Sequence, residues 1–192
     1  MAESDQISGS RKAELQPLTA YIQSRIRKNQ PVQITFICTH NSRRSHFAQI
    51  WAQAVAWWYG IPGVTTFSGG TEVTAFNPKA VRAIEAAGFS VEKTGYENNP
   101  LYLIRYSDSQ PPLRAFSKVF DQGGNPAGDF AAVMTCTHAD ENCPFIPGAT
   151  RISLPYEDPK AFDGTPEEEA IYAERCRQIA RELLFAFSQV KT

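Results

Sequence analysis

The chain has 192 residues, of which 42% are hydrophobic and 20% charged, and its formal net charge is −1. These values are typical of a globular protein, and we expect a single domain over residues 1–192. The near-neutral charge argues against nucleic acid or an anionic membrane as a partner. The sequence has no apolar run that could span a bilayer and begins with the polar stretch MAESDQISGSRKAEL, which is unlike a secretory signal. We therefore expect a cytoplasmic protein.

The N-terminal region divides into two parts. Residues 1–10 are small and polar, and we expect them to be disordered. Residues 11–28 carry an apolar stripe at helical spacing, formed by Leu15, Leu18, Ile22 and Ile26. This pattern predicts an amphipathic helix. The helix could bind a partner, but packing on the body of the domain is the favoured interpretation.

The most informative stretch is VQITFI followed by CTHNSRRS, residues 32–45. The first six residues are rich in β-branched and apolar side chains and predict a buried strand ending at Cys38. A helical pattern, HFAQIWAQAVAWWYG, begins at residue 46. The polar loop between them therefore leads into a helix N-terminus, where unpaired N–H groups and the helix dipole favour an anion.

The side chains of this loop suit nucleophilic chemistry on an oxyanion. The same field would favour a thiolate at Cys38, and Arg44 can offer a planar fork to a tetrahedral anion. We hypothesise that the loop binds phosphate or arsenate and that Cys38 attacks its central atom. The binding residues would be Thr39, His40, Ser42, Arg43 and Arg44. The alternative is a buried structural cysteine beside solvated arginines, which the strand, the helix and Ser45 disfavour.

The rest of the chain alternates strands and helices. Further strands are predicted at 64–68, 129–135 and 151–154, with helices at 46–59, at 78–87 and near the C-terminus. This alternation predicts an α/β three-layer sandwich, in which helices flank a four-stranded parallel sheet. Residues 96–128 interrupt the rhythm with YLIRYS and LRAFSKVFD around the turn DSQPP. They predict a β-hairpin insertion that either covers the site or protects a sheet edge.

Two later loops should lie near Cys38. Cys136 follows the predicted strand 129–135, and PYEDP follows 151–154. Because parallel strands end at a common edge, both loops should meet there. Asp158, before Pro159, is a candidate general acid for a leaving oxygen. Glu157 and Asp163 are less favoured stand-ins, and a plain surface turn is the alternative.

CTHNSRRS resembles the active-site loop of the low-molecular-weight protein tyrosine phosphatase superfamily, which includes the thioredoxin-coupled arsenate reductases. That loop runs Cys, two residues, Asn, two residues, Arg, Ser, and Cys38, Asn41, Arg44 and Ser45 match it. The resemblance implies that Asn41 braces the loop, that Ser45 hydrogen-bonds the thiolate and that Asp158 is the acid. His40 stands where the family usually has Gly. Either the loop tolerates a left-handed His or its shape differs.

CTHADENCP, residues 136–144, is similar to the redox loop of those arsenate reductases. The resemblance implies that Cys136 attacks Cys38 after arsenate has bound to it, that Cys143 resolves the disulfide, and that thioredoxin reduces the product. The alternatives are inert cysteines or a zinc site with His138, although a structural zinc needs four ligands. The fourth cysteine, Cys176, lies in an apolar helical stripe and is expected in the core.

Three functions remain in order of preference. The first is arsenate reduction with thioredoxin as electron donor and with no bound cofactor or metal. The second is a phosphatase that hydrolyses phosphotyrosine or a small phosphoester through a phosphocysteine at Cys38. Lys160 and Ala161 stand where such phosphatases tend to carry tyrosines, which weakens this second function, although Tyr156, Phe162 or the insertion could replace them. The third is an anion-binding module without turnover.

Overall fold

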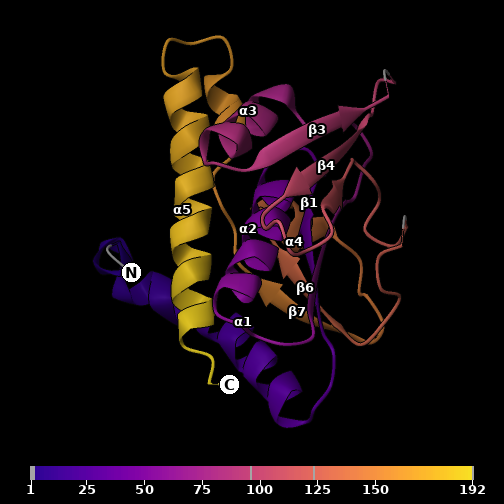
Figure 1. Ribbon diagram of the computed structural model, residues 1–192, viewed down its shortest axis with the longest axis vertical. Coiled ribbons are helices and arrows are strands. Elements are labelled where there is room, and N and C mark those ends of the chain that lie inside the picture. The colour runs from indigo at the N-terminus through magenta and orange to yellow at the C-terminus, as the bar shows by residue number, and fades with distance from the viewer. Residues whose placement is uncertain (1–2, 96, 123, 192) are drawn as a thin grey trace.

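A computed structural model describes residues 3–95, 97–122 and 124–191. Its centre is a parallel sheet of four strands in the order β2-β1-β6-β7 (Figure 1). The strands are β1 Val32–Cys38, β2 Val64–Gly70, β6 Phe130–Met134 and β7 Ala149–Ser153. The predicted four-stranded parallel sheet is therefore confirmed, and β1, which carries Cys38 at its end, lies inside it between β2 and β6.

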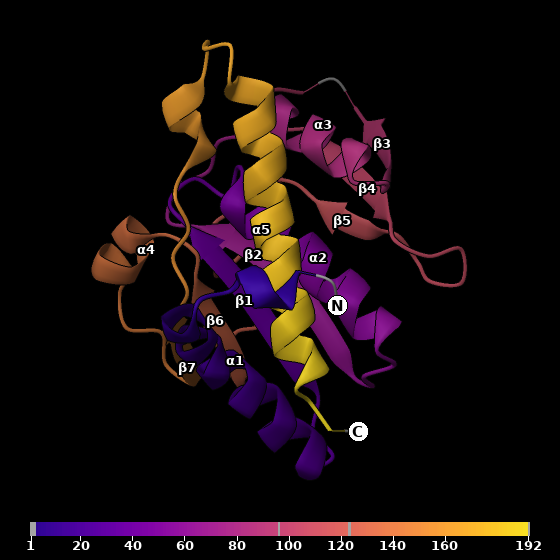
Figure 2. The same ribbon diagram turned by 90° about the vertical axis from the view of Figure 1, so that its left-hand side faces the viewer.

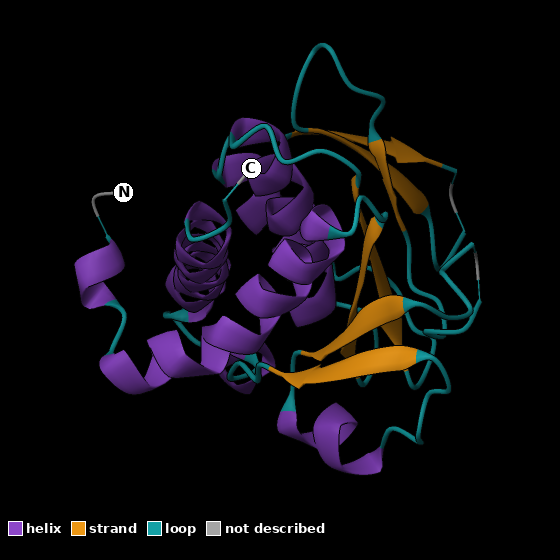
Figure 3. Ribbon diagram, turned by 90° about the horizontal axis from the view of Figure 1, so that it is seen from below, coloured by secondary structure: helices purple, strands orange, loops and turns teal. Residues whose placement is uncertain are grey.

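The long helices gather on one face of this sheet (Figure 3). The helices are α1 Gly9–Arg27, α2 Arg44–Trp58, α3 Pro78–Ala86, α4 Thr137–Asn142 and α5 Glu168–Ser188, with short 3-10 turns at η1 Ser4–Gln6 and η2 Pro159–Phe162. Ile34 and Phe36 of β1 share a buried core with residues of α1, α2 and α5. Strand alternation turns Ile37 to the opposite face.

The third layer of the sandwich is thin. On the opposite face Ile37 and Met134 cluster with Ala139 of α4 and with the loop residues Phe120 and Ile146. A six-residue helix and loops thus cover this face. The small side chains Ala132 and Ala139 allow such shallow cover to close over the strands. No helix in the described part of the chain is long and apolar enough to cross a membrane.

The N-terminal helix packs on the body of the domain, as predicted. Leu15, Leu18 and Ile22 are fully buried, and Thr19 Oγ1 donates to the carbonyl of Ala186 in α5 at 3.0 Å. Figure 2 shows α1 passing beside the lower end of α5. These contacts explain the apolar stripe through packing within the chain.

The expected disorder of residues 1–10 is wrong for residues 3–10; residues 1 and 2 lie outside the described part. Ser8 caps α1 by accepting from the N–H of Arg11 at 3.2 Å. The carboxylate of Glu3 pairs with Arg177 and, at 3.3 Å, with Arg181 of α5. A helix cap and two ion pairs therefore order residues 3–10, although their composition predicted disorder.

The predicted hairpin is present but belongs to a larger unit. Its strands, β4 Leu101–Arg105 and β5 Leu113–Ala115, pair antiparallel around the predicted turn. A third strand that the sequence analysis missed, β3 Ser90–Thr94, pairs with the other side of β4. β3 is mostly exposed, so it lacks the apolar alternation that reveals a strand. Residues 96 and 123 of the insertion lie outside the description, and the extent 96–128 and the single domain stay predictions.

The chain leaving the hairpin runs beside the end of β2. The N–H of Gly70 donates to the carbonyl of Lys118 at 2.8 Å, and the N–H of Phe120 donates to the carbonyl of Gly70 at 3.0 Å. A Cβ on Gly69 would lie 2.3 Å from Phe120 Cα, so this approach requires glycine. The insertion therefore extends the sheet edge next to the end of β2.

The packing of α1 can be tested by truncating a buried side chain. Leu18→Ala should lower the free energy of unfolding by about 2–5 kcal/mol, because it leaves a cavity between α1 and the core. Gln16→Ala, on the exposed side of the same helix, should change it by less than about 0.5 kcal/mol. Urea unfolding followed by circular dichroism measures both. Equal, small effects would contradict the packing role of α1.

Candidate active site

The loop from β1 to α2 surrounds the sulfur of Cys38. Cys38 is 3% exposed, and its Sγ lies 3.1 Å from the hydroxyl of Ser45. Among the described residues, the backbone N–H groups of residues 39–45 have no hydrogen-bond acceptor. Arg43, at the N-cap of α2, supplies no side-chain cap. Successive free amides at a helix N-terminus have the geometry that an anion site requires. That this loop binds an anion stays a prediction.

Asn41 gives the loop its shape. Its φ is 44°, and His40 is not among the described residues with positive φ. Asn accepts this left-handed conformation more readily than His, so the missing glycine is tolerated without a left-handed His40. The Asn41 amide donates to Ser45 Oγ at 2.9 Å, and its oxygen accepts from the N–H of Lys118 at 3.0 Å.

Thr74, in the segment after β2, and Ser117, in the insertion, hold the outside of the loop, and the sequence analysis did not identify either residue. The carbonyl of His40 accepts from Thr74 Oγ1 at 3.0 Å and from Ser117 Oγ at 2.9 Å. A Cβ on Gly70 would lie 2.7 Å from the Asn41 nitrogen, so the glycine pair after β2 allows the loop to pack there. The glycine pair in SGGT was the one local signal of this close approach.

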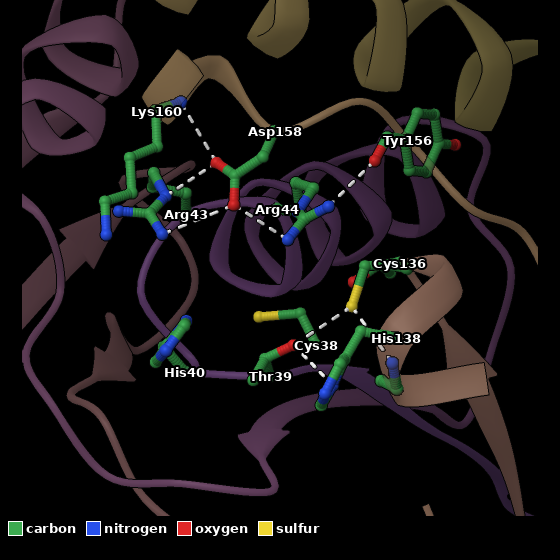
Figure 4. Close-up of polar contacts among 12 residues, drawn as sticks. Cys38, Thr39, His40, Arg43, Arg44, Cys136, His138, Tyr156, Asp158 and Lys160 are labelled. Atoms are coloured by element: carbon green, nitrogen blue, oxygen red, sulfur yellow. Dashed lines mark hydrogen bonds and ion pairs between the residues drawn. The ribbon is translucent and has the colours of Figure 1, made fainter. Parts of the chain in front are cut away.

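The carboxylate of Asp158 forms ion pairs with both arginines of the loop, Arg43 and Arg44 (Figure 4). Arg44 donates to its Oδ2 at 2.8 Å, and Arg43 places Nε 2.9 Å from Oδ1. The N–H of Lys160 donates to Oδ1 at 3.1 Å. The predicted acid therefore stands at the loop, as an internal carboxylate that an incoming oxyanion must displace from Arg44. Of the stand-ins, Asp163 is tied to Lys79 at 3.2 Å, and Glu157 is exposed.

The second and third cysteines lie at opposite ends of α4. Cys136 is the N-cap, and the N–H of Ala139 donates to its sulfur at 3.4 Å. Its Sγ is also 3.5 Å from Thr39 Oγ1, on the residue after Cys38. Cys143 is the C-cap, and burial raises the pKa of its thiol. The structure thus brings Cys38, Cys136 and Cys143 into one buried cluster.

A disulfide between Cys136 and Cys143 needs a change of shape. At about 1.5 Å of rise per residue, the seven steps between them separate their Cα atoms by about 10 Å while α4 is helical. A disulfide requires about 4.4–6.8 Å. The two thiols can therefore join only after α4 unwinds.

Two buried titratable groups lie behind the loop. His46, in the first turn of α2, has a pKa lowered to about 3 by burial and by the charge of Lys118, so it is neutral. Its Nδ1 lies 3.2 Å from Ser68 Oγ. Burial lowers the pKa of Lys118 to about 8, so at pH 7 its amine is mostly protonated and adds positive charge near the loop. Neither residue was singled out from sequence.

Several expected side chains lie away from the site. Tyr156 is buried under the guanidinium of Arg11, 4.7 Å from the ring centroid, so it cannot flank a substrate ring. Phe162 is 40% exposed. Cys176 is buried against Trp51, whose Nε1 donates to its sulfur at 3.2 Å, and burial raises its pKa to about 11. Within the described ranges, no cluster of three or more His, Cys, Asp or Glu residues could hold a metal ion.

No protein-family model matches the chain, but curated relatives do. An arsenate reductase of Brevibacillus brevis is 30% identical over 130 residues, which cover 66% of this chain and 75% of the relative. An arsenate reductase of Halalkalibacterium halodurans is 25% identical over 157 residues, covering 81% and 94%. These alignments are long enough to compare whole domains.

Solved structures share the fold. An arsenate reductase in the reduced state is similar with a TM-score of 0.52 and 18% identity, over 83% of this chain and 99% of that one. A mutant of YwlE from Bacillus subtilis gives a TM-score of 0.51 and 16% identity, over 82% and 97%. At these identities the likeness shows the fold alone.

The role of Asn41 can be separated into backbone and amide parts. Asn41→Gly keeps the positive φ but loses both amide hydrogen bonds, whereas Asn41→Ala loses the bonds and is strained by about 1–2 kcal/mol. We expect both variants to bind phosphate at least several-fold more weakly, and the Ala variant to be the less stable. Calorimetric titration with phosphate and urea unfolding measure the two effects. Unchanged phosphate binding by Asn41→Gly would show that the amide does not brace the loop.

Proposed function

Since this chain belongs to the arsenate reductase family within the low-molecular-weight protein tyrosine phosphatase superfamily, we propose that it reduces arsenate through Cys38, Cys136 and Cys143, with thioredoxin as electron donor. The observation that carries this proposal is the single buried cluster of these three cysteines at the end of β1. The choice of arsenate as the substrate rests on the similarity to arsenate reductases. We further propose that the chain acts as one domain in the cytoplasm, where thiols are kept reduced.

The first step is substitution at arsenic. The loop amides and Arg44 hold the arsenate, and the Cys38 thiolate attacks the arsenic atom. Once Arg44 has turned to the oxyanion, Asp158 takes up a proton from solvent and gives it to the departing oxygen, which leaves as water. The Ser45 hydroxyl, 3.1 Å from Cys38 Sγ, stabilises the thiolate. The product of this step is an arsenic–sulfur bond at Cys38.

The second step reduces arsenic. The thiolate of Cys136 attacks Cys38 Sγ, a disulfide forms, and the sulfur–arsenic bond breaks. The electron pair of that bond stays on arsenic, which goes from As(V) to As(III) and leaves as arsenite. Cys143 then attacks Cys136, freeing Cys38. Because Cys143 is buried and lies at the other end of α4 from Cys136, this last attack requires α4 to unwind.

The alternative is a phosphatase that stops after the first step. Cys38, Arg44 and Asp158 would form and hydrolyse a phosphocysteine from phosphotyrosine or a small phosphoester. The complete anion loop favours this activity as much as it favours arsenate reduction. The burial of Tyr156 weakens the case for phosphotyrosine, because that ring cannot flank an aromatic substrate. An anion-binding module without turnover would bind phosphate but release no product in either assay.

Two assays distinguish these functions. The first is arsenate-dependent oxidation of NADPH in the presence of thioredoxin and thioredoxin reductase, and the second is hydrolysis of an aryl phosphate. Arsenate turnover that disappears in Cys136→Ser, while aryl phosphate cleavage survives, would establish the relay. Aryl phosphate cleavage without arsenate turnover would identify a phosphatase. Turnover in neither assay, with phosphate still bound, would identify an anion-binding module.

Cys38→Ser should abolish both activities, because the alcohol is a far weaker nucleophile than the thiolate at neutral pH. We expect at least a thousandfold loss of turnover, with phosphate binding measured by calorimetry as the check that the loop is intact. Retained turnover in either assay would remove Cys38 as the nucleophile.

Cys143→Ser should allow one round of arsenate reduction and then stop, because no thiol resolves the Cys38–Cys136 disulfide. Multiple-turnover NADPH oxidation should fall at least a hundredfold, whereas the stoichiometric release of one arsenite should persist. Cys176→Ser is the matched control, since Cys176 lies outside the cluster against Trp51, and its turnover should match that of the unmodified protein. Equal losses in both variants would mean that removal of Cys143 acts through stability.

A further inference from the structure

The hydroxyl of Thr39 lies between a sulfur and an imidazole. Thr39 Oγ1 is 3.5 Å from Cys136 Sγ and 3.3 Å from His138 Nδ1. Figure 4 shows both contacts converging on this one oxygen. A threonine hydroxyl can accept one hydrogen bond while it donates another. The three side chains therefore form a continuous chain of hydrogen bonds from the second cysteine of the relay to an imidazole.

We propose that His138 is a positioning residue that takes the proton of Cys136 through Thr39 and so prepares the second nucleophile. This inference rests on the proposed function for its purpose, because only the reductase needs a nucleophilic Cys136. Its hydrogen bond on this side is to Thr39 Oγ1, so His138 would act through the hydroxyl of Thr39.

The proton of Cys136 reaches His138 in two transfers. The S–H of Cys136 donates its proton to Thr39 Oγ1, and the hydroxyl proton of Thr39 passes to His138 Nδ1. Cys136 becomes a thiolate and His138 an imidazolium. The thiolate attacks Cys38 Sγ, the sulfur–arsenic bond breaks, and its electron pair reduces As(V) to As(III). The departing arsenite takes a proton from His138 or from water, which returns the imidazole to its neutral state.

The surroundings favour a charge-separated pair. The N–H of Ala139, 3.4 Å from Cys136 Sγ, favours the thiolate. His138 is exposed, so solvent can stabilise its charge and exchange its proton. The other charged groups of α4 are Asp140, paired with Arg151 of β7 at 3.3 Å, and the exposed Glu141. β1 and β6, which pack against α4, carry no titratable side chain except Cys38.

The other nearby histidines cannot take this role. His46 is buried with its Nδ1 beside Ser68 Oγ, and His40 pairs with Glu72 at 3.6 Å. His138 lies in the first turn of α4, two residues after the N-cap Cys136. This arrangement allows both side chains to reach Thr39. The local spacing Cys136-Thr137-His138 therefore forms a relay only because Thr39 of the loop lies between the two side chains.

The test follows the thiolate of Cys136 directly. The full-length, reduced protein is alkylated with iodoacetamide between pH 5 and pH 10, and peptide mass spectrometry resolves Cys136 from the other cysteines. His138→Asn keeps an acceptor for the Thr39 hydroxyl but cannot take a proton, so it separates a basic role from a structural one. We expect the half-maximal pH for Cys136 to rise by about one unit and its rate at pH 6.5 to fall about tenfold.

Thr39→Val, which breaks the hydrogen-bond chain at its centre, should produce the same shift. Glu141→Gln is the control, because it changes an exposed charge of α4 that contacts neither thiol nor imidazole. The alkylation profile of Cys176 in each variant reports whether the fold is intact. Profiles of His138→Asn and Thr39→Val that match the unmodified protein would overturn the proposal.

Failure of the His138 role and failure of the proposed reductase function give different results. If the unmodified protein reduces arsenate but His138→Asn forms the Cys38–Cys136 disulfide just as fast in a single turnover, the role of His138 fails and the reductase stands. If the alkylation shift is found but no arsenate is reduced, the proposed function fails while the activation of Cys136 stands.

Discussion

The structure depends on the loop between β1 and α2, whose backbone N–H groups have no acceptor within the described part of the chain. Such a loop cannot be stabilised by its own amides, so its carbonyls and side chains must hold it in place. Asn41 bonds to Ser45 on one side and to the main chain of Lys118 on the other, and the His40 carbonyl accepts from two hydroxyls. The glycine at position 70, the insertion and the left-handed Asn41 all serve this one requirement.

The electrostatics of the loop depend on the partners of Arg43 and Arg44. Arg43 and Arg44 lie in a buried environment, where a guanidinium without a partner would be costly. Asp158 supplies that partner, with contacts of 2.9 and 2.8 Å. The carboxylate therefore holds the arginines in order, and an oxyanion must exchange with it to bind Arg44. In the proposed mechanism, this exchange couples substrate binding to movement of the loop that carries Asp158.

The proposed redox half of the site depends on the short helix α4. α4 has six residues, and an isolated helix of this length is unstable in water without tertiary contacts. It holds Cys136 near Thr39 and keeps Cys143 buried. The same helix must unwind for Cys136 and Cys143 to join, and its small size keeps the cost of unwinding low. In the proposed relay, one short helix therefore both positions Cys136 and, by unwinding, exposes Cys143.

Local residue patterns were sufficient to predict the strand, loop and helix around Cys38, the parallel sheet, the hairpin and the packing of α1. These follow from periodicity and spacing within a few residues. Only the tertiary structure placed the N–H of Lys118 on Asn41, across 77 residues, or buried Tyr156 beneath Arg11. It also ordered residues 3–10 through Glu3 and added β3, whose exposed surface gave no apolar pattern. These outcomes depend on contacts between distant segments, and local residue patterns do not encode which distant groups will meet.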